Sequence, residues 1–222
     1  MKLYHGTSEP NLEIILKQGI IPRKVRKDQR GNWKHSIKSN PDAVYLTNAY
    51  AVFYAQAAVQ KGERLAVLEI DTSLLFPWRL TPDEDFLEQA SRKQRVKDDK
   101  GGVCTPEMSM KQRTMWYRRR LLQFAHMWEK SLEGLGNCCY HETVPVKAIR
   151  RYATLPTASP ISFATDPCMT LLNYAIMGGY YRELTKHVFG EPMDLSQETV
   201  GFHREYLSKL TRDDVEVKEL QS

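Results

Sequence analysis

Residues 3–19 read LYHGTSEPNLEIILKQG and join a short apolar segment to the start of a helix. Residues 2–5 predict a strand, and residues 8–11 form a helix start that has a proline in its first turn. Apolar residues then recur at helical spacing until Gly19 ends the run. We therefore expect a strand followed directly by a helix.

Outward from this segment, residues 43–47 (AVYLT) and 64–71 (RLAVLEID) predict two further strands. A helix is expected between them over residues 49–59, with Asn48 as its cap. Residues 23–42 are polar and basic, and they predict a long loop.

The second half of the chain predicts mainly helices with two late strands. The expected elements are a helix opening at Thr81-Pro82-Asp83-Glu84, a charged break at 97–102, a long helix over 106–132, strands over 138–144 and 149–155, helices over 169–188 and 196–210, and a charged tail. Late strands that return to early ones predict an α+β fold with a mixed sheet. We expect a domain over residues 1–157 with a basic helical insertion at about 82–135, and a helical C-terminal extension over 158–222 packed on it.

The composition is that of a soluble globular protein. The 222 residues are 41% hydrophobic and 27% charged, and no apolar run approaches the roughly 20 residues of a membrane span. The N-terminus has no signal-peptide pattern, and the four cysteines form no CxxC pair, so we expect reduced thiols, a cytoplasmic location and no membrane partner. The six histidines have no HExxH or HxH spacing, and we expect no metal site.

The net charge of +5 is concentrated in residues 23–38 and 92–120. Such stretches either contact phosphate-rich partners or form a solvated face. Within the second, Trp116-Tyr117-Arg118-Arg119-Arg120 interleaves aromatic and basic side chains, a pattern that suits nucleic-acid contact. Phe124, Met127 and Trp128 continue the aromatic stripe at helical spacing, which instead favours core packing.

Three short segments carry the functional hypothesis: residues 3–7 (LYHGT), 44–47 (VYLT) and 140–145 (YHETVP). Each is weak alone, but their order and surroundings are informative. The arrangement resembles the ADP-ribosyltransferase superfamily, in its diphtheria-toxin-like and PARP-like branch with a His–Tyr–Glu triad. The resemblance covers roughly residues 2–155, and it implies the split mixed β-sheet of that family.

The resemblance implies a role for each matching residue in binding NAD. His5 would bond the adenine-side ribose, Gly6 would offer its backbone to the nicotinamide carboxamide, and Thr7 would add a hydroxyl. Tyr45 would stack on the nicotinamide ring. Glu142 would stabilise the oxocarbenium-like charge that develops as nicotinamide leaves, and would help to orient the nucleophile.

Further residues near these motifs are candidates of lower rank. Tyr54 is the expected second stacking tyrosine, with Tyr50 as its competitor. Arg23 either pairs with the pyrophosphate or is a surface arginine. His141 should point away from Glu142 by strand alternation and is expected to be structural. Tyr140 stands where arginine-modifying relatives carry Gln or Glu, which argues against arginine-specific modification.

The sequence thus predicts an NAD-dependent mono-ADP-ribosyltransferase that modifies a macromolecule, either a protein side chain or a nucleic-acid base. NAD glycohydrolysis is the nearest alternative, because water can replace the acceptor. An RNA 2′-phosphotransferase is a lesser one, since Tyr45 stands where that family has histidine. A non-catalytic binding module with a basic surface is the alternative from a different class.

Overall fold

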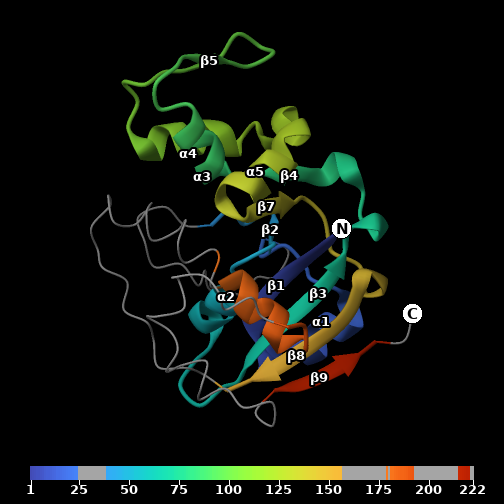
Figure 1. Cartoon of the computed structure of the whole chain (residues 1–222). Helices are drawn as coiled ribbons and strands as arrows, with labels where there is room; N and C mark the ends of the chain where they lie inside the picture. Colours follow the sequence, from blue (N-terminus) through green and yellow to red (C-terminus); the bar gives the residue numbers. More distant parts are fainter. Residues whose placement is uncertain (25–38, 157–178, 180, 193–214, 221–222) are drawn as a thin grey trace.

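The computed structural model describes residues 1–24, 39–156, 179, 181–192 and 215–220. Seven strands in this part of the chain form one sheet in the order β4-β7-β2-β1-β3-β8-β9 (Figure 1). The strands are β1 (Lys2–Ser8), β2 (Val44–Thr47), β3 (Leu65–Asp71), β4 (Leu80–Pro82), β7 (Asn137–Tyr140), β8 (Ile149–Leu155) and β9 (Glu216–Glu219). Every neighbouring pair is antiparallel, so the α+β class is confirmed while the mixed sheet is not.

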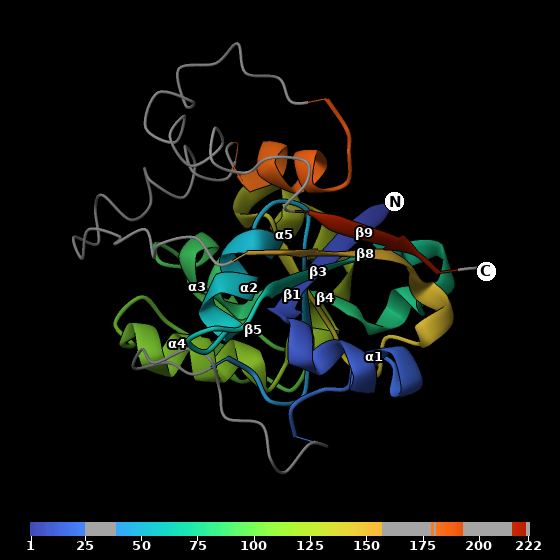
Figure 2. The ribbon, with the colours of Figure 1, turned by 90° about the horizontal axis from the view of Figure 1, so that it is seen from below.

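Side chains that alternate along the strands build two separate cores, one on each face of the sheet. On one face, Leu3 and Leu68 pack with α1 (Leu12–Gln18). On the other, Tyr4 and Val67 pack with α2 (Ala51–Ala58) and with a helix over residues 181–188. Figure 2 shows α1 on one side of the strands and the 181–188 helix on the other.

The early elements follow the sequence closely. The helix α1 ends at Gly19, whose φ of 81° suits glycine, and the Gly19 amide bonds the Ile15 carbonyl at 2.7 Å. The helix α2 starts two residues later than expected. Thr47 Oγ1 accepts from the amides of Ala49 and Tyr50 at 3.0 and 2.8 Å and so holds the turn that leads into α2. The helix begins after Tyr50 without a side-chain cap, so the capping role predicted for Asn48 is wrong.

Both helices that the sequence predicts for the insertion differ from the helices in the structure. Thr81 lies in strand β4, and Asp83 caps α3 (Glu84–Ala90) by accepting from the Asp85 amide at 2.9 Å. The prediction of one long helix over 106–132 is wrong. The structure has α4 (Met110–Arg118), a 3₁₀ segment (Leu121–Met127) and α5 (Trp128–Leu135) in its place.

Capping and packing explain why that helix is divided. Ser109 and Gln112 form a capping box that starts α4 well after Pro106. Tyr117 and Leu121, on either side of the break, are both buried in a small core of the insertion. Tertiary burial of these two side chains therefore overrides the continuous helical pattern.

The charged break expected at residues 97–102 is the turn of a short hairpin, β5 (Val96–Lys97) with β6 (Val103–Cys104).

The strand expected over 138–144 is shorter than predicted. It ends at Tyr140, and residues 141–142 form a bend. Val144 instead bridges Ile20 through two backbone hydrogen bonds of 2.9 and 3.0 Å. The bend changes the direction of the chain at the position of Glu142.

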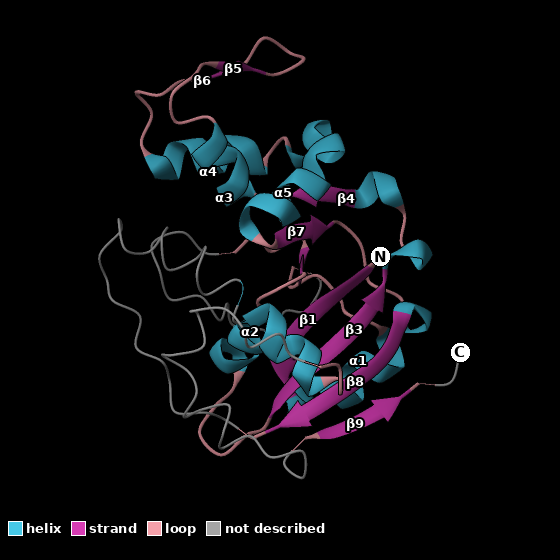
Figure 3. Ribbon diagram, viewed as in Figure 1, coloured by secondary structure: helices cyan, strands magenta, loops and turns pink. Residues whose placement is uncertain are grey.

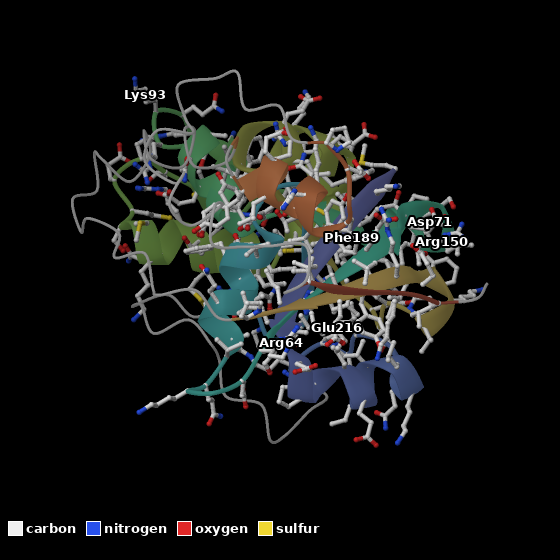
Figure 4. The ribbon with its side chains drawn as sticks, turned by 60° about the horizontal axis from the view of Figure 1, so that its bottom comes forward. Arg64, Asp71, Lys93, Arg150, Phe189 and Glu216 are labelled. Atoms are coloured by element: carbon white, nitrogen blue, oxygen red, sulfur yellow. The ribbon has the colours of Figure 1, made fainter. Side chains whose placement is uncertain are left out.

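The C-terminal region adds a strand that the sequence does not predict. Glu216–Glu219 forms β9, which pairs with β8 where a charged tail was expected (Figure 3). The last described strand therefore belongs to the same sheet as the N-terminal one. The helix expected over 196–210 lies outside the described residues, as does most of the one over 169–188. In Figure 4, Asp71 of β3 lies beside Arg150 of β8, with which it forms an ion pair.

Candidate functional site

The central strands β1 and β2 are joined much more loosely than β1 and β3. All seven residues of β1 pair with β3, from Lys2 with Asp71 to Ser8 with Leu65. Only Tyr4, opposite Thr47, pairs with β2. The two strands therefore separate beyond this pair, and the side chains along the separation are the candidate site.

His5 spans the separation between the two strands. Its Nδ1 lies 3.0 Å from the Tyr45 carbonyl oxygen. Burial lowers the pKa of His5 below its ordinary 6.5, against the opposing effect of this hydrogen bond. The ring is therefore neutral at pH 7, and because a carbonyl can only accept, Nδ1 carries the proton. Nε2 is left as an acceptor, which suits a hydroxyl ligand.

Tyr45 is half-buried, with its hydroxyl enclosed by protein groups. The hydroxyl donates to Glu84 Oε1 at 2.8 Å and accepts from the Asn40 amide at 2.7 Å. Burial, and after it the charge of Glu84, raises the pKa of Tyr45 well above its ordinary value of 10.0. The phenol is therefore protonated throughout the physiological range and is held at its hydroxyl end.

Glu84 is a site residue that the sequence analysis missed. It is 3% exposed, and its Oε1 accepts from Arg118 Nη2 at 2.7 Å as well as from Tyr45. Its other oxygen lies 4.0 Å from Cys139 Sγ of β7. The only signal in the sequence was the acidic first turn of a helix, which by itself indicates capping.

Gly6 lies on β1 next to His5, and the packing of α2 gives a second reason why this position has no side chain. A Cβ at Gly6 would lie 1.9 Å from the Ala51 carbonyl oxygen and 2.6 Å from the Ala55 nitrogen. Glycine here allows α2 to pack directly on β1. The neighbouring Thr7 is buried, and its hydroxyl accepts from Asn11 Nδ2 at 3.0 Å, so it stabilises the start of α1.

Tyr54 rather than Tyr50 reaches the start of β7. Its hydroxyl accepts from Asn137 Nδ2 at 2.7 Å, while Tyr50 is 5% exposed and packs near the Tyr181 ring. Asn137 lies two residues from Cys139, which pairs with Tyr45, so the three side chains share one face of the sheet. Asn137 Oδ1 is buried without a hydrogen-bond partner among the described residues. Asn137 was not predicted as a site residue, because it lies between the helix expected to end at residue 132 and the strand expected from residue 138.

Glu142 does not join His5 and Tyr45. Its carboxylate pairs with Arg79 Nε at 3.0 Å, and both side chains are more than one-third exposed. His141, one residue earlier, bonds Thr81 Oγ1 at 2.9 Å on the face that Tyr45 occupies. Alternation along β7 therefore directs Glu142 away from Tyr45.

Glu142 instead lines a separate pocket of about 420 Å³ beyond the ends of β2 and β7. The lining residues are Pro22, Lys24, Asp42, His141, Glu142 and Thr143. Of the expected triad, the His5 ring thus contacts the backbone of Tyr45, strand alternation directs the His5 and Tyr45 side chains to opposite faces, and Glu142 lies apart from both.

Arg23 contacts the other end of its own loop. Its Nη2 donates to the Ser39 carbonyl oxygen at 2.6 Å, so its guanidinium joins the two ends of the segment 25–38, which is not described. Next to it, Lys24 pairs with Asp42 at 2.9 Å. Both cations stand near the Glu142 pocket, and neither contacts His5 or Tyr45.

The aromatic and basic stretch at 116–120 packs inside the insertion. Trp116 and Tyr117 belong to its core, and Arg120 lies 4.3 Å from the centre of the Trp116 ring. Arg118 pairs with Glu84, and Arg120 with Asp98. Core packing is therefore the role of this stripe in the described structure.

Within the described residues no group of three or more His, Cys, Asp or Glu side chains is arranged to hold a metal. Across the same residues, no helix has the length and apolar character needed to cross a bilayer. Cys104, Cys138 and Cys139 are free thiols, and Cys168 lies outside the described residues.

The chain matches no protein-family model, and no curated protein matches its sequence.

Proposed function

We propose that the protein is an NAD-dependent mono-ADP-ribosyltransferase that modifies a macromolecule. The observation that carries this proposal is the separation of β1 from β2, with the His5 ring bonded to the Tyr45 backbone carbonyl across it. These two residues come from motifs 40 positions apart, and both match the family that the sequence resembles. We also propose that this separation is the split sheet of that family.

The chemistry of the pair suits a dinucleotide. A neutral His5 with Nε2 as an acceptor can receive a hydrogen bond from a ribose hydroxyl. Tyr45 offers a ring for stacking on nicotinamide, while Tyr54 and Asn137 add polar groups on the Tyr45 face. Asn137 Oδ1, which lacks a partner among the described residues, can accept from a ligand hydroxyl or amide.

Glu142 enters this proposal at a different place from the one expected. Its pocket carries both Lys24 and Asp42, and Arg79 pairs with Glu142 at its edge. A charged pocket beside the NAD site suits the macromolecular acceptor, which arrives as nicotinamide leaves. We therefore assign Glu142 to acceptor binding.

The test is incubation with labelled NAD and a cell lysate, followed by protease or nuclease treatment of matched samples. Label released by protease identifies a protein acceptor, and label released by nuclease identifies DNA or RNA. Free ADP-ribose with no labelled macromolecule would make the protein a glycohydrolase. If the protein consumes no NAD at all, the proposal is wrong. His5→Ala and Tyr45→Ala should abolish consumption in the active protein.

A further inference from the structure

We infer that Glu84, held by Arg118, is a positioning residue for Tyr45, and that the helical insertion thereby forms part of the NAD site. The inference rests on the function proposed above and replaces Glu142 as the carboxylate partner of Tyr45. It is carried by a chain of contacts from β2 through α3 to α4.

One carboxylate oxygen joins the whole unit. Glu84 Oε1 accepts from the Tyr45 hydroxyl at 2.8 Å, and from Arg118 at 2.7 Å through Nη2 and 3.2 Å through Nε. The Asn40 amide donates to the same hydroxyl at 2.7 Å. With one donor and one acceptor interaction at its hydroxyl, the Tyr45 ring is held at its far end.

Burying this charge is costly, and the structure compensates for it locally. The Glu84 and Arg118 side chains are 3% and 15% exposed. A buried carboxylate without a partner is costly, whereas hydrogen bonds from a guanidinium offset that cost. Arg118 therefore stabilises the Glu84 side chain in the position where it accepts from Tyr45.

The same helix supplies a matched control. Glu88, one turn beyond Glu84, is equally buried and pairs with Arg113 at 2.6 Å and with Arg92 at 3.0 Å. It makes no side-chain hydrogen bond to β2 in the described structure. Loss of its charge should disturb α3 as much as loss of the Glu84 charge, without affecting Tyr45.

The experiment compares Glu84→Gln with Glu88→Gln in nicotinamide release from NAD, with thermal unfolding of each protein measured in parallel. We expect Glu84→Gln to raise the KM for NAD about tenfold while kcat falls much less, because a strong hydrogen bond that orients the ring is weakened. Glu88→Gln should lower the unfolding temperature with an unchanged KM.

A double-mutant cycle tests whether Glu84 acts through Tyr45. Tyr45→Phe removes the hydroxyl and keeps the ring. In that background Glu84→Gln should raise KM no further, because the contact between the two residues is already lost. Full additivity of the two KM effects would contradict a positioning role.

Two further outcomes keep the inference separable from the proposed function. A parent protein that consumes NAD, with Glu84→Gln showing the parental KM, overturns the inference alone, whereas a parent that consumes none overturns both. If Glu84→Gln does not fold, Arg118→Lys keeps a cation beside Glu84 and removes the two-donor geometry. It should raise KM by a smaller factor, and a parental KM in that variant would also overturn the inference.

Discussion

His5 illustrates how one hydrogen bond determines the chemistry of a side chain. Burial keeps the ring neutral, and because Nδ1 donates a hydrogen bond to the Tyr45 carbonyl, Nε2 is the acceptor that the ring presents. Protonation of Nε2 would remove that acceptor. At the residue scale, activity and stability should therefore respond to acid through His5.

The pH dependence of stability provides the first test. The folded-state pKa of His5 is lowered below 6.5, so above pH 6.5 both the folded and the unfolded chain carry a neutral ring. As pH falls below 6.5, the unfolded chain takes up the proton first. The free energy of unfolding should then decrease by up to about 1.4 kcal/mol for each pH unit, until the folded pKa is reached.

His5→Asn is the variant for this test, because an asparagine amide can also donate to the Tyr45 carbonyl and does not titrate. Urea unfolding of both proteins at several pH values between 7.5 and 5 isolates the His5 contribution as their difference. His141 has a lowered pKa from burial as well, and it titrates in both proteins, so it cancels. Parallel curves for the two proteins would contradict the neutral assignment.

Gly6 gives a second prediction at the residue scale. Gly6→Ala places a methyl group against the backbone of α2, and backbone cannot rotate away as a side chain can. We expect a loss of about 3 kcal/mol in the free energy of unfolding. Gly179→Ala, where an added Cβ meets nothing within 4 Å, is the control and should cost little. Urea unfolding of the two variants measures the difference.

At the scale of elements, ion pairs between acidic and arginine side chains stabilise the insertion. Two of these pairs join α3 to α4, and a third joins Arg120 to Asp98 in the turn before β6. Glu88 accepts from Arg113, which is buried, and from Arg92, which is 45% exposed at its side chain. Removing the buried arginine leaves a buried carboxylate with one exposed partner. We expect Arg113→Met to cost about 3 kcal/mol of unfolding free energy and Arg92→Met less than about 1 kcal/mol.

Chemical unfolding followed by tryptophan fluorescence checks this pair, since Trp116 packs in the core of the insertion. Equal losses for the two variants would mean that burial does not distinguish the two arginines. A loss confined to Arg92→Met would contradict the description of the insertion core.

The elements themselves were predictable where local signals acted alone. The strand containing His5, the stop at Gly19 and the strand containing Tyr45 follow from residue pattern. The division of the 106–132 helix and the pairing of β9 depend on burial of side chains from distant segments. No window of local sequence contains that information.

The candidate site likewise contains residues that local sequence signals predict and residues that only distant contacts bring together. The motifs placed His5 and Tyr45 in one site, and the hydrogen bond from the His5 ring to the Tyr45 backbone carbonyl follows from the strand order. The position of Glu142 was not predicted, because the strand expected to run to residue 144 ends at Tyr140 and the chain bends at residues 141–142. Glu84 and Asn137 carry sequence signals of helix ends, and only the sheet order brings both to the Tyr45 face.

At the scale of the whole molecule, the sheet is completed by a strand from the far end of the chain. All four residues of β9 are exposed, so it contributes backbone hydrogen bonds to β8 more than apolar burial. Removal of residues 215–222 should expose the β8 edge, which makes the protein prone to self-association. Light scattering and size-exclusion chromatography should then show aggregates that the full chain does not form.

A control for this truncation keeps the strand and alters only a side chain. Val217→Thr changes an exposed β9 residue without removing a backbone donor, and it should remain monodisperse wherever the full chain is. If the truncated protein behaves like the full chain, β9 does not protect the edge.

The late position of β9 also bears on biosynthesis. A ribosome adds about five to twenty residues per second, so seconds elapse between the emergence of β8 and that of the strand that covers it. During this interval the nascent chain displays a row of unsatisfied amides and carbonyls along an otherwise finished sheet. Productive folding in the cell thus depends on neighbouring nascent chains being kept apart until β9 has been synthesised.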